Sequence, residues 1–195
     1  MKKYILPMGI EKLIIKKEWA NLFQKIRYIC MQELLNQIRV GLDNNLYYLS
    51  LFASLAVPDI CGALTTENGI ATKEGYIKWF DINVAQPNGY FLTGIDCYYF
   101  RCSMVHQGTT QHLSSLFQRI IFAEPGNTTN IFHNNIILNA LNIDVVIFCN
   151  DIIDSAIKWF EAVQDDPNFK KNYELFVRRY ADGLLPFIAG VPVIG

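Results

Sequence analysis

One segment of this 195-residue chain carries signals for both ends of a helix, and it constrains the fold more than any other part. Thr93 is followed three residues later by Asp96, a variant of the capping box in which two side chains hold the first turn of a helix. Gly108 stands where helices commonly end in a left-handed residue. These signals predict a helix over residues 94–107.

Further helices are predicted along most of the chain, because apolar residues recur at spacings of three and four. Gly41 is expected to end the first of them and Asp43 to begin the second, which kinks or restarts at Pro58. Thr72 and the pair Asp166–Pro167 are helix-start signals of the same kind. The predicted helices cover residues 18–40, 43–58, part of 58–69, 72–84, 142–163 and 167–180.

Only residues 116–138 have a pattern typical of β-structure. Two runs rich in β-branched and aromatic residues flank a Pro-Gly-Asn turn at residues 125–127, which predicts a β-hairpin. We therefore expect one mainly α domain over residues 1–195, a helical bundle with a small β-hairpin insertion at about 116–138. Residues 1–17 are expected to form an N-terminal appendage and the Pro- and Gly-rich residues 183–195 a C-terminal coil, both packed against the bundle.

The amino-acid composition limits the classes of function that this chain can have. Hydrophobic residues make up 51% of the chain, enough for a sizeable core. The 17 lysines and arginines are balanced by 18 acidic residues, which argues against nucleic-acid binding through bulk positive charge but is compatible with a local basic groove. The five cysteines follow no CxxC spacing, and each is expected to be a buried, reduced thiol, as in a cytoplasmic protein. The longest uncharged apolar stretch, residues 44–58, is too short for a bilayer, and no signal-peptide pattern is present, so no membrane association is expected.

Arg101 and His106, both within the predicted helix over residues 94–107, are the strongest candidate site. The sequence has no Gly-rich phosphate loop, GxSxG elbow or HExxH motif, and its three histidines lack metal-ligand spacing, so neither metal nor cofactor is expected. At about 100° per residue, the two side chains point roughly 140° apart on the helix. A structural arginine paired with Asp59 or Asp144, beside a histidine that only caps the helix, is the alternative to a working site.

Residues 98–108, YYFRCSMVHQG, form an aromatic-rich helix end that closes on His-Gln-Gly. This segment resembles the R-x4-H signature of the HEPN superfamily, and the predicted layout from about residue 18 to residue 180 is similar to that family's helical bundle. The resemblance implies a homodimer through the 94–107 helix, with both motif copies in a shared cleft. It also implies metal-independent RNA cleavage, in which Arg101 contacts the scissile phosphate and His106 transfers a proton at the ribose 2′-hydroxyl, leaving a cyclic phosphate.

One position departs from the family pattern. Catalytic members of the superfamily usually carry a polar residue, often Asn or Asp, directly after the arginine, whereas this chain has Cys102. Many HEPN domains are non-catalytic, so a non-catalytic interaction or nucleotide-binding module is the alternative function. Tyr98 and Gln107 are the other residues that the resemblance implies as supporting ones, and a toxin–antitoxin or phage-defence role follows from family analogy alone.

A basic group in the last predicted helix is a further candidate. Its members belong to one amphipathic pattern, which is typical of a solvated face or, alternatively, of a rim that steers phosphate towards a site. They are Lys170, Lys171, Arg178 and Arg179.

Overall fold

The structure, a computed structural model, describes residues 30–112, 114–126 and 132–195. The chain divides into two compact units, residues 35–175 and a second unit described over residues 30–34 and 176–195. The appendage predicted for residues 1–17 lies outside the described residues, as does the first part of the helix predicted for residues 18–40. Residues 30–43 are helical, so this helix continues past Gly41.

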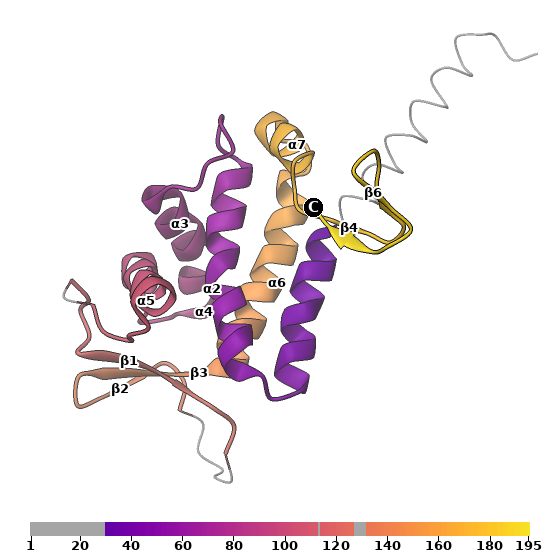
Figure 1. Cartoon of the computed structure of the whole chain (residues 1–195). Helices are drawn as coiled ribbons and strands as arrows, with labels where there is room; N and C mark the ends of the chain where they lie inside the picture. Colours follow the sequence, from indigo (N-terminus) through magenta and orange to yellow (C-terminus); the bar gives the residue numbers. More distant parts are fainter. Residues whose placement is uncertain (1–29, 113, 127–131) are drawn as a thin grey trace, which may run out of the picture. The chain divides into compact units, whose positions relative to one another are not determined.

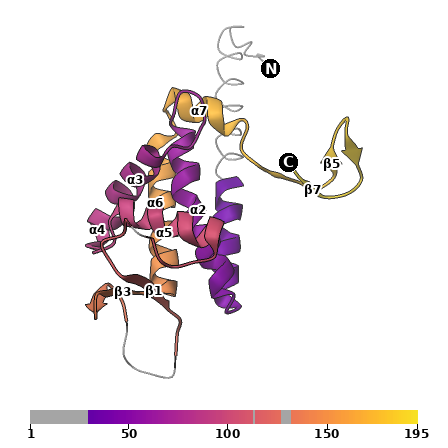
Figure 2. The same ribbon diagram turned by 60° about the vertical axis from the view of Figure 1, so that its left-hand side comes forward.

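The 35–175 unit is mostly helical, as the sequence predicts. Its helical segments after residue 43 are α2 (Tyr47–Leu64), α3 (Lys73–Phe80), the π-helical turn η1 (Asp81–Ala85), α4 (Gln86–Asn88), α5 (Gly94–Gln107), α6 (Val145–Val163) and α7 (Pro167–Tyr173). The α2 helix contacts α3, α5, α6 and α7. Figures 1 and 2 show α2 and α6 side by side, with α5 next to α2 and running across its direction.

Aromatic side chains fill the core of this unit and hold the inner face of α5. Tyr76 and Phe148 are fully buried, and burial of such a side chain contributes about 1.5–3 kcal/mol. The Tyr76 hydroxyl lies 3.3 Å from Cys97 Sγ on α5. The Phe100 ring packs 5.1 Å from the ring of Phe122. These contacts fix the rotation of α5 and therefore decide which of its residues face outwards.

Pro58 lies inside α2, so the predicted alternative that the helix restarts at this residue is wrong. A proline within a helix removes one backbone hydrogen bond. Here Leu55, Val57 and Cys61 are buried on either side of it, so packing outweighs that loss and the helix continues to Leu64. By contrast, Thr72 caps α3 as predicted, because its hydroxyl accepts a hydrogen bond from the backbone N–H of Gly75 at 3.0 Å.

Strand β1 (Arg119–Ala123) does not pair with β2 (Asn135–Ile137), so the predicted hairpin over about 116–138 is wrong. The sheet has the order β1-β3-β2, in which β3 (Ala140–Asp144) is parallel to β1 and antiparallel to β2. The hairpin joins β2 to β3 through Leu138 and Asn139, whose φ angles are 49° and 59°. Leucine rarely adopts this left-handed conformation, so the turn carries no strong sequence signal. Figure 1 shows the sheet at the end of α6 where that helix begins.

The C-terminal segment also differs from its prediction. Asp166 caps α7 as expected, by accepting a hydrogen bond from Phe169 N at 2.8 Å, but the helix ends at Tyr173 and not at residue 180. The predicted coil over residues 183–195 contains short paired strands. Strand β4 (Arg179–Tyr180) pairs with β7 (Val193–Ile194), and β5 (Gly183–Leu184) pairs with β6 (Ile188–Ala189). A side chain at Gly183, where φ is 96°, would collide with the backbone of Ile188, so this turn depends on glycine.

One helix among the described residues, α2, is long and apolar enough to cross a membrane by length and composition alone. Half of that stretch is buried inside the protein, as in a core helix, so the match is weak evidence for a membrane span.

Asp144 begins α6 by accepting hydrogen bonds from the backbone N–H groups of Val146 and Ile147, each at 2.9 Å. We expect Asp144→Ala to lower the free energy of unfolding by about 1–2 kcal/mol, because both amides lose their acceptor. Urea denaturation checks this value. Asp43 supplies the control: it is exposed, and the N-cap residue of α2 is Leu46, which forms no side-chain cap, so the sequence-based prediction of an Asp43 cap is wrong. Asp43→Ala should change the free energy by less than about 0.5 kcal/mol, and equal losses in the two variants would contradict this assignment.

Candidate functional site

Helix α5 carries the candidate site, and local signals set its ends. The Thr93 hydroxyl accepts a hydrogen bond from Asp96 N at 3.3 Å and donates one to the Asp96 carboxylate at 2.6 Å. Gly108 ends the helix with a φ of 65°. The buried Asp96 also accepts a hydrogen bond from Leu116 N at 2.9 Å, which holds the following loop against the start of the helix. The predicted boundaries of this helix are confirmed.

Arg101 projects from α5 towards α2 and forms an ion pair with Asp59 through Nη2. Both side chains are mostly buried, with 23% of Arg101 and 14% of Asp59 exposed. Asp59 is the partner because α2 continues through Pro58 and carries the carboxylate to α5. Asp144, the other candidate, caps α6 instead. The ion pair holds the guanidinium in one place at the surface of the bundle.

Arg101 and His106 meet within one protomer. Arg101 Nη1 lies 3.5 Å from His106 Nε2, although the two residues point in different directions from the helix axis. The long arginine side chain spans this difference, and Nη1 also lies 3.8 Å from Cys102 Sγ. When Nη1 donates to Nε2, that nitrogen is the proton-free acceptor of the imidazole. His106 itself is exposed.

Burial and charge act in opposite directions on this ion pair. Burial raises the pKa of the Asp59 carboxyl above its usual range, and the nearby Arg101 and His106 offset this rise only in part. For Arg101, burial lowers the pKa of the guanidinium, but the charge of Asp59 and the contacts with Cys102 and Asp59 outweigh burial and raise it. Arg101 therefore keeps its charge, and desolvation of Asp59 is the main cost of the pair.

The raised pKa of Asp59 predicts how the stability of the protein depends on pH. The folded protein binds the Asp59 proton more tightly than the unfolded chain, so ionisation of this group lowers stability as the pH rises from the ordinary aspartate value through the folded value. Asp59→Asn removes this titration. The free energy of unfolding of the wild type, relative to that of Asp59→Asn, should therefore be larger at pH 4 than at pH 7 in urea titrations. A difference that grows with pH would show that the attraction of Arg101 outweighs burial.

The residues implied as supporting ones lie near the pair. Tyr98 is half-buried, and burial together with a hydrogen bond to Cys102 raises the pKa of its phenol. Cys102 is also half-buried. Gln107 is exposed at the end of α5.

One face of α5 is open. Its inner face holds the buried Cys97, Phe100 and Met104, whereas Ile95 is 40% exposed and Val105 is 42% exposed. The helix is therefore not enclosed by its own protomer. This open face carries the Arg101–His106 pair.

The four basic residues predicted to form a phosphate-steering rim do not share one helix. Lys170 pairs with Asp165 at 2.9 Å, and Lys171 donates to the backbone carbonyl of Glu67 at 3.1 Å. Both lie on α7, whereas Arg178 and Arg179 belong to the second unit. The predicted helix over residues 167–180, on which the rim depended, ends before these arginines.

A second group on the open face of α5 was missed by sequence analysis. Lys73 Nζ donates to the Tyr99 hydroxyl at 3.1 Å, and the Tyr99 ring stacks on the ring of His112 at a centroid distance of 4.2 Å. Lys73 is 26 positions from Tyr99. Only the paired tyrosines at positions 98 and 99 are visible in the sequence, and the spacing to Lys73 and His112 carries no motif.

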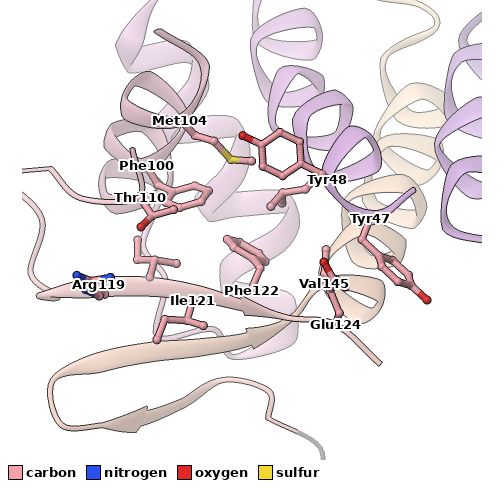
Figure 3. A pocket seen from close by; sticks show the side chains of 12 residues that line it. Tyr47, Tyr48, Phe100, Met104, Thr110, Arg119, Ile121, Phe122, Glu124 and Val145 are labelled. Carbon is pink, nitrogen blue, oxygen red and sulfur yellow. The ribbon is translucent and has the colours of Figure 1, made fainter. Parts of the chain in front are cut away.

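Described residues of the 35–175 unit line at least two cavities. The first has a volume of about 400 Å³ and is mostly apolar; Figure 3 shows Tyr48, Phe100 and Met104 on one side of it and strand β1 on the other. Neither Arg101 nor His106 lines it. The second, of about 540 Å³, has a lining that is about half polar and half apolar, and His112 is part of it.

All five cysteines are free. The predicted burial is confirmed for Cys61, Cys97 and Cys149 and is wrong for Cys30 and Cys102, which are half-buried. Within the described part of the chain, no three His, Cys, Asp or Glu side chains gather as a metal site would require. Comparisons with protein-family models, with curated proteins and with solved structures find no match to this chain.

Proposed function

We propose that this protein is a HEPN-like, metal-independent endoribonuclease that acts as a homodimer in the cytoplasm. The observation that carries the proposal is the contact of 3.5 Å between Arg101 Nη1 and His106 Nε2 on an open helix face. A fixed guanidinium next to an exposed imidazole combines a phosphate-binding group with a group suited to proton transfer near neutral pH.

The two side chains have complementary roles in this reaction. His106 Nε2 accepts the proton of a ribose 2′-hydroxyl as its oxygen attacks the adjacent phosphorus. Arg101 binds the phosphate oxygens through its planar fork and stabilises the charge that builds up on them. The bond from phosphorus to the 5′-oxygen breaks, and the leaving oxygen takes a proton from a protonated His106. The products are a 2′,3′-cyclic phosphate and a 5′-hydroxyl.

Binding of the phosphate also prepares the histidine. In the free protein, Arg101 Nη1 lies within reach of Nε2 of His106. A phosphate oxygen is a stronger acceptor than a neutral imidazole, so substrate draws the guanidinium away and leaves Nε2 free. Asp59 holds the other end of the guanidinium during this change.

A second copy of the chain completes the site in this proposal. The half-exposed Ile95 and Val105 flank the pair on α5 and offer apolar contacts for a two-fold interface. Such an interface would bring two histidines together, one for each proton transfer. Size-exclusion chromatography with light scattering should therefore report a dimer.

The alternative is a non-catalytic interaction or nucleotide-binding module that uses the same face. The Arg101–Asp59 ion pair favours it, because this pair already occupies one side of the guanidinium. Cys102, which lies directly after the arginine, favours it as well.

The deciding experiment incubates the wild-type protein with hairpin and single-stranded RNAs in EDTA. We expect fragments that end in a 2′,3′-cyclic phosphate, identified by mass spectrometry of the 3′ ends. Intact RNA across all substrates, or fragments that end in a 3′-hydroxyl, would favour the non-catalytic alternative or different chemistry.

A further inference from the structure

We propose that the open face of α5 and the loop after it form a stacking pocket for one unpaired nucleobase, next to Arg101 and His106. Lys73, Tyr99 and His112 are its main residues. This inference rests on the proposed function, because it assigns single-stranded RNA as the substrate class of the same site.

The first support is the geometry of the aromatic group. The Tyr99 and His112 rings are nearly parallel, with an interplanar angle of 5° and a centroid distance of 4.2 Å. Lys73 Nζ lies 4.7 Å from the centroid of Tyr99 and 5.7 Å from that of Tyr98. Stacked rings beside a cation are the combination with which proteins bind unpaired bases and the phosphates between them.

The second support is the cavity of about 540 Å³ beside His112. Its volume falls within the range of small-ligand sites. His112 lines the cavity and Tyr99 does not, so the cavity lies at the histidine end of the stack. A base placed there would extend the stack by one ring.

The walls of this cavity suit the edges of a base. His112 Nδ1 accepts a hydrogen bond from Ser114 N at 3.1 Å, which leaves Nε2 as the N–H donor of a neutral ring. Side-chain amides supply both donors and acceptors around the cavity, and they belong to Gln111, Gln118 and Asn139. Among the described residues that line it, none carries a charged side chain, as expected for a pocket that holds a neutral base rather than a phosphate.

The pocket lies within reach of the proposed catalytic pair. Tyr99 and His106 are seven residues apart, which places them on the same side of α5 and about 10 Å apart along its axis. Lys73 is half-buried next to the stack, and its ammonium group can meet the phosphate backbone of a strand that leaves the pocket. A short single strand can therefore occupy the pocket and the Arg101–His106 pair together.

The test measures binding of a non-cleavable probe, a fluorescently labelled, unstructured 2′-O-methyl RNA dodecamer, by anisotropy. Tyr99→Ala and His112→Ala should each weaken binding at least about ten-fold. Tyr99→Phe keeps the ring and should stay within about three-fold of the wild type. The exposed Gln118→Ala, which leaves the core intact, should weaken binding several-fold. Tyr48→Ala is the matched control, because Tyr48 is 63% exposed and lies outside this cavity.

Each outcome of this test either supports or contradicts the proposed pocket. Unchanged binding in both Tyr99→Ala and Gln118→Ala, or no binding by the wild type, would overturn the pocket. Equal affinity for a duplex of the same length would overturn it as well, because the pocket needs an unpaired base. A different result would contradict the proposed nuclease activity. RNA binding that depends on Tyr99, without any cleavage, would support the pocket and contradict the nuclease. Cleavage by Tyr99→Ala with an unchanged KM would instead support the nuclease and contradict the pocket.

Discussion

Replacement of His106 by alanine is expected to lower the rate of RNA cleavage about 10³-fold, the middle of the range for loss of a general acid–base group. The imidazole is the only group next to Arg101 on α5 that is suited to accept the 2′-hydroxyl proton at neutral pH. Single-turnover cleavage of a labelled hairpin RNA measures the rate. The side chain is exposed, so the variant should unfold at the same temperature as the wild type.

His133→Ala is the matched control for this substitution. His133 packs against the Tyr90 ring at 5.2 Å and lies outside the proposed site, so its loss should leave the cleavage rate unchanged. Cleavage that persists in His106→Ala would remove His106 from the mechanism. A parallel loss in His133→Ala would point instead to damaged folding.

Arg101→Ala is expected to reduce cleavage by about 10²–10³-fold, because the phosphate loses its main source of charge stabilisation. Arg101→Lys should recover little, since a lysine cannot bind Asp59 and two phosphate oxygens with a planar fork. Removal of the guanidinium also leaves the mostly buried Asp59 without its partner. We therefore expect a loss of about 1–2 kcal/mol in the free energy of unfolding.

A double substitution separates the two consequences of losing Arg101. Arg101→Ala combined with Asp59→Ala removes the unpaired carboxylate, so stability should recover in part while cleavage stays lost. A double variant that regains cleavage would show that Arg101 acts only by neutralising Asp59. Arg119→Ala, on the exposed edge of β1, controls for the loss of one positive charge and should keep full activity.

Both predictions depend on the same arrangement. Asp59 fixes the guanidinium from α2, and His106 stands at its free edge on α5. Residues five positions apart point in different directions from a helix, which in the sequence argues against a joint role for Arg101 and His106. The structure shows that their side chains nevertheless meet. The proposed dimer is therefore not needed to bring Arg101 to His106, and its role is to supply a second histidine.

Helix boundaries with side-chain caps were predictable from the sequence. Thr72, Thr93 and Asp166 each accept a backbone hydrogen bond from a residue three positions on, so the signal lies within one helical turn. Asp43 shows the limit of this rule, because a residue of the right type is a cap only if its carboxylate reaches the free amides.

The pairing of strands was not predictable in the same way. The Pro-Gly-Asn turn suggested a hairpin between β1 and β2, but β1 pairs in parallel with β3, more than twenty residues away. The choice depends on burial of Ile120, Leu141 and Ile143 between the sheet and the helices. Such burial is a property of the assembled core, and no local turn signal reports it.

The sequence by itself determined that the 35–175 unit is mostly helical, that α5 runs from Gly94 to Gln107, and that Arg101 and His106 stand on it. These features follow from caps and spacings that act over a few residues. Only the tertiary structure decided that Asp59, 42 positions from Arg101, holds the guanidinium, and that Lys73 and His112 gather around Tyr99. The physical reason is that α2, α3 and α5 take their relative positions from the packing of buried side chains, and this packing brings together polar groups that are distant along the chain.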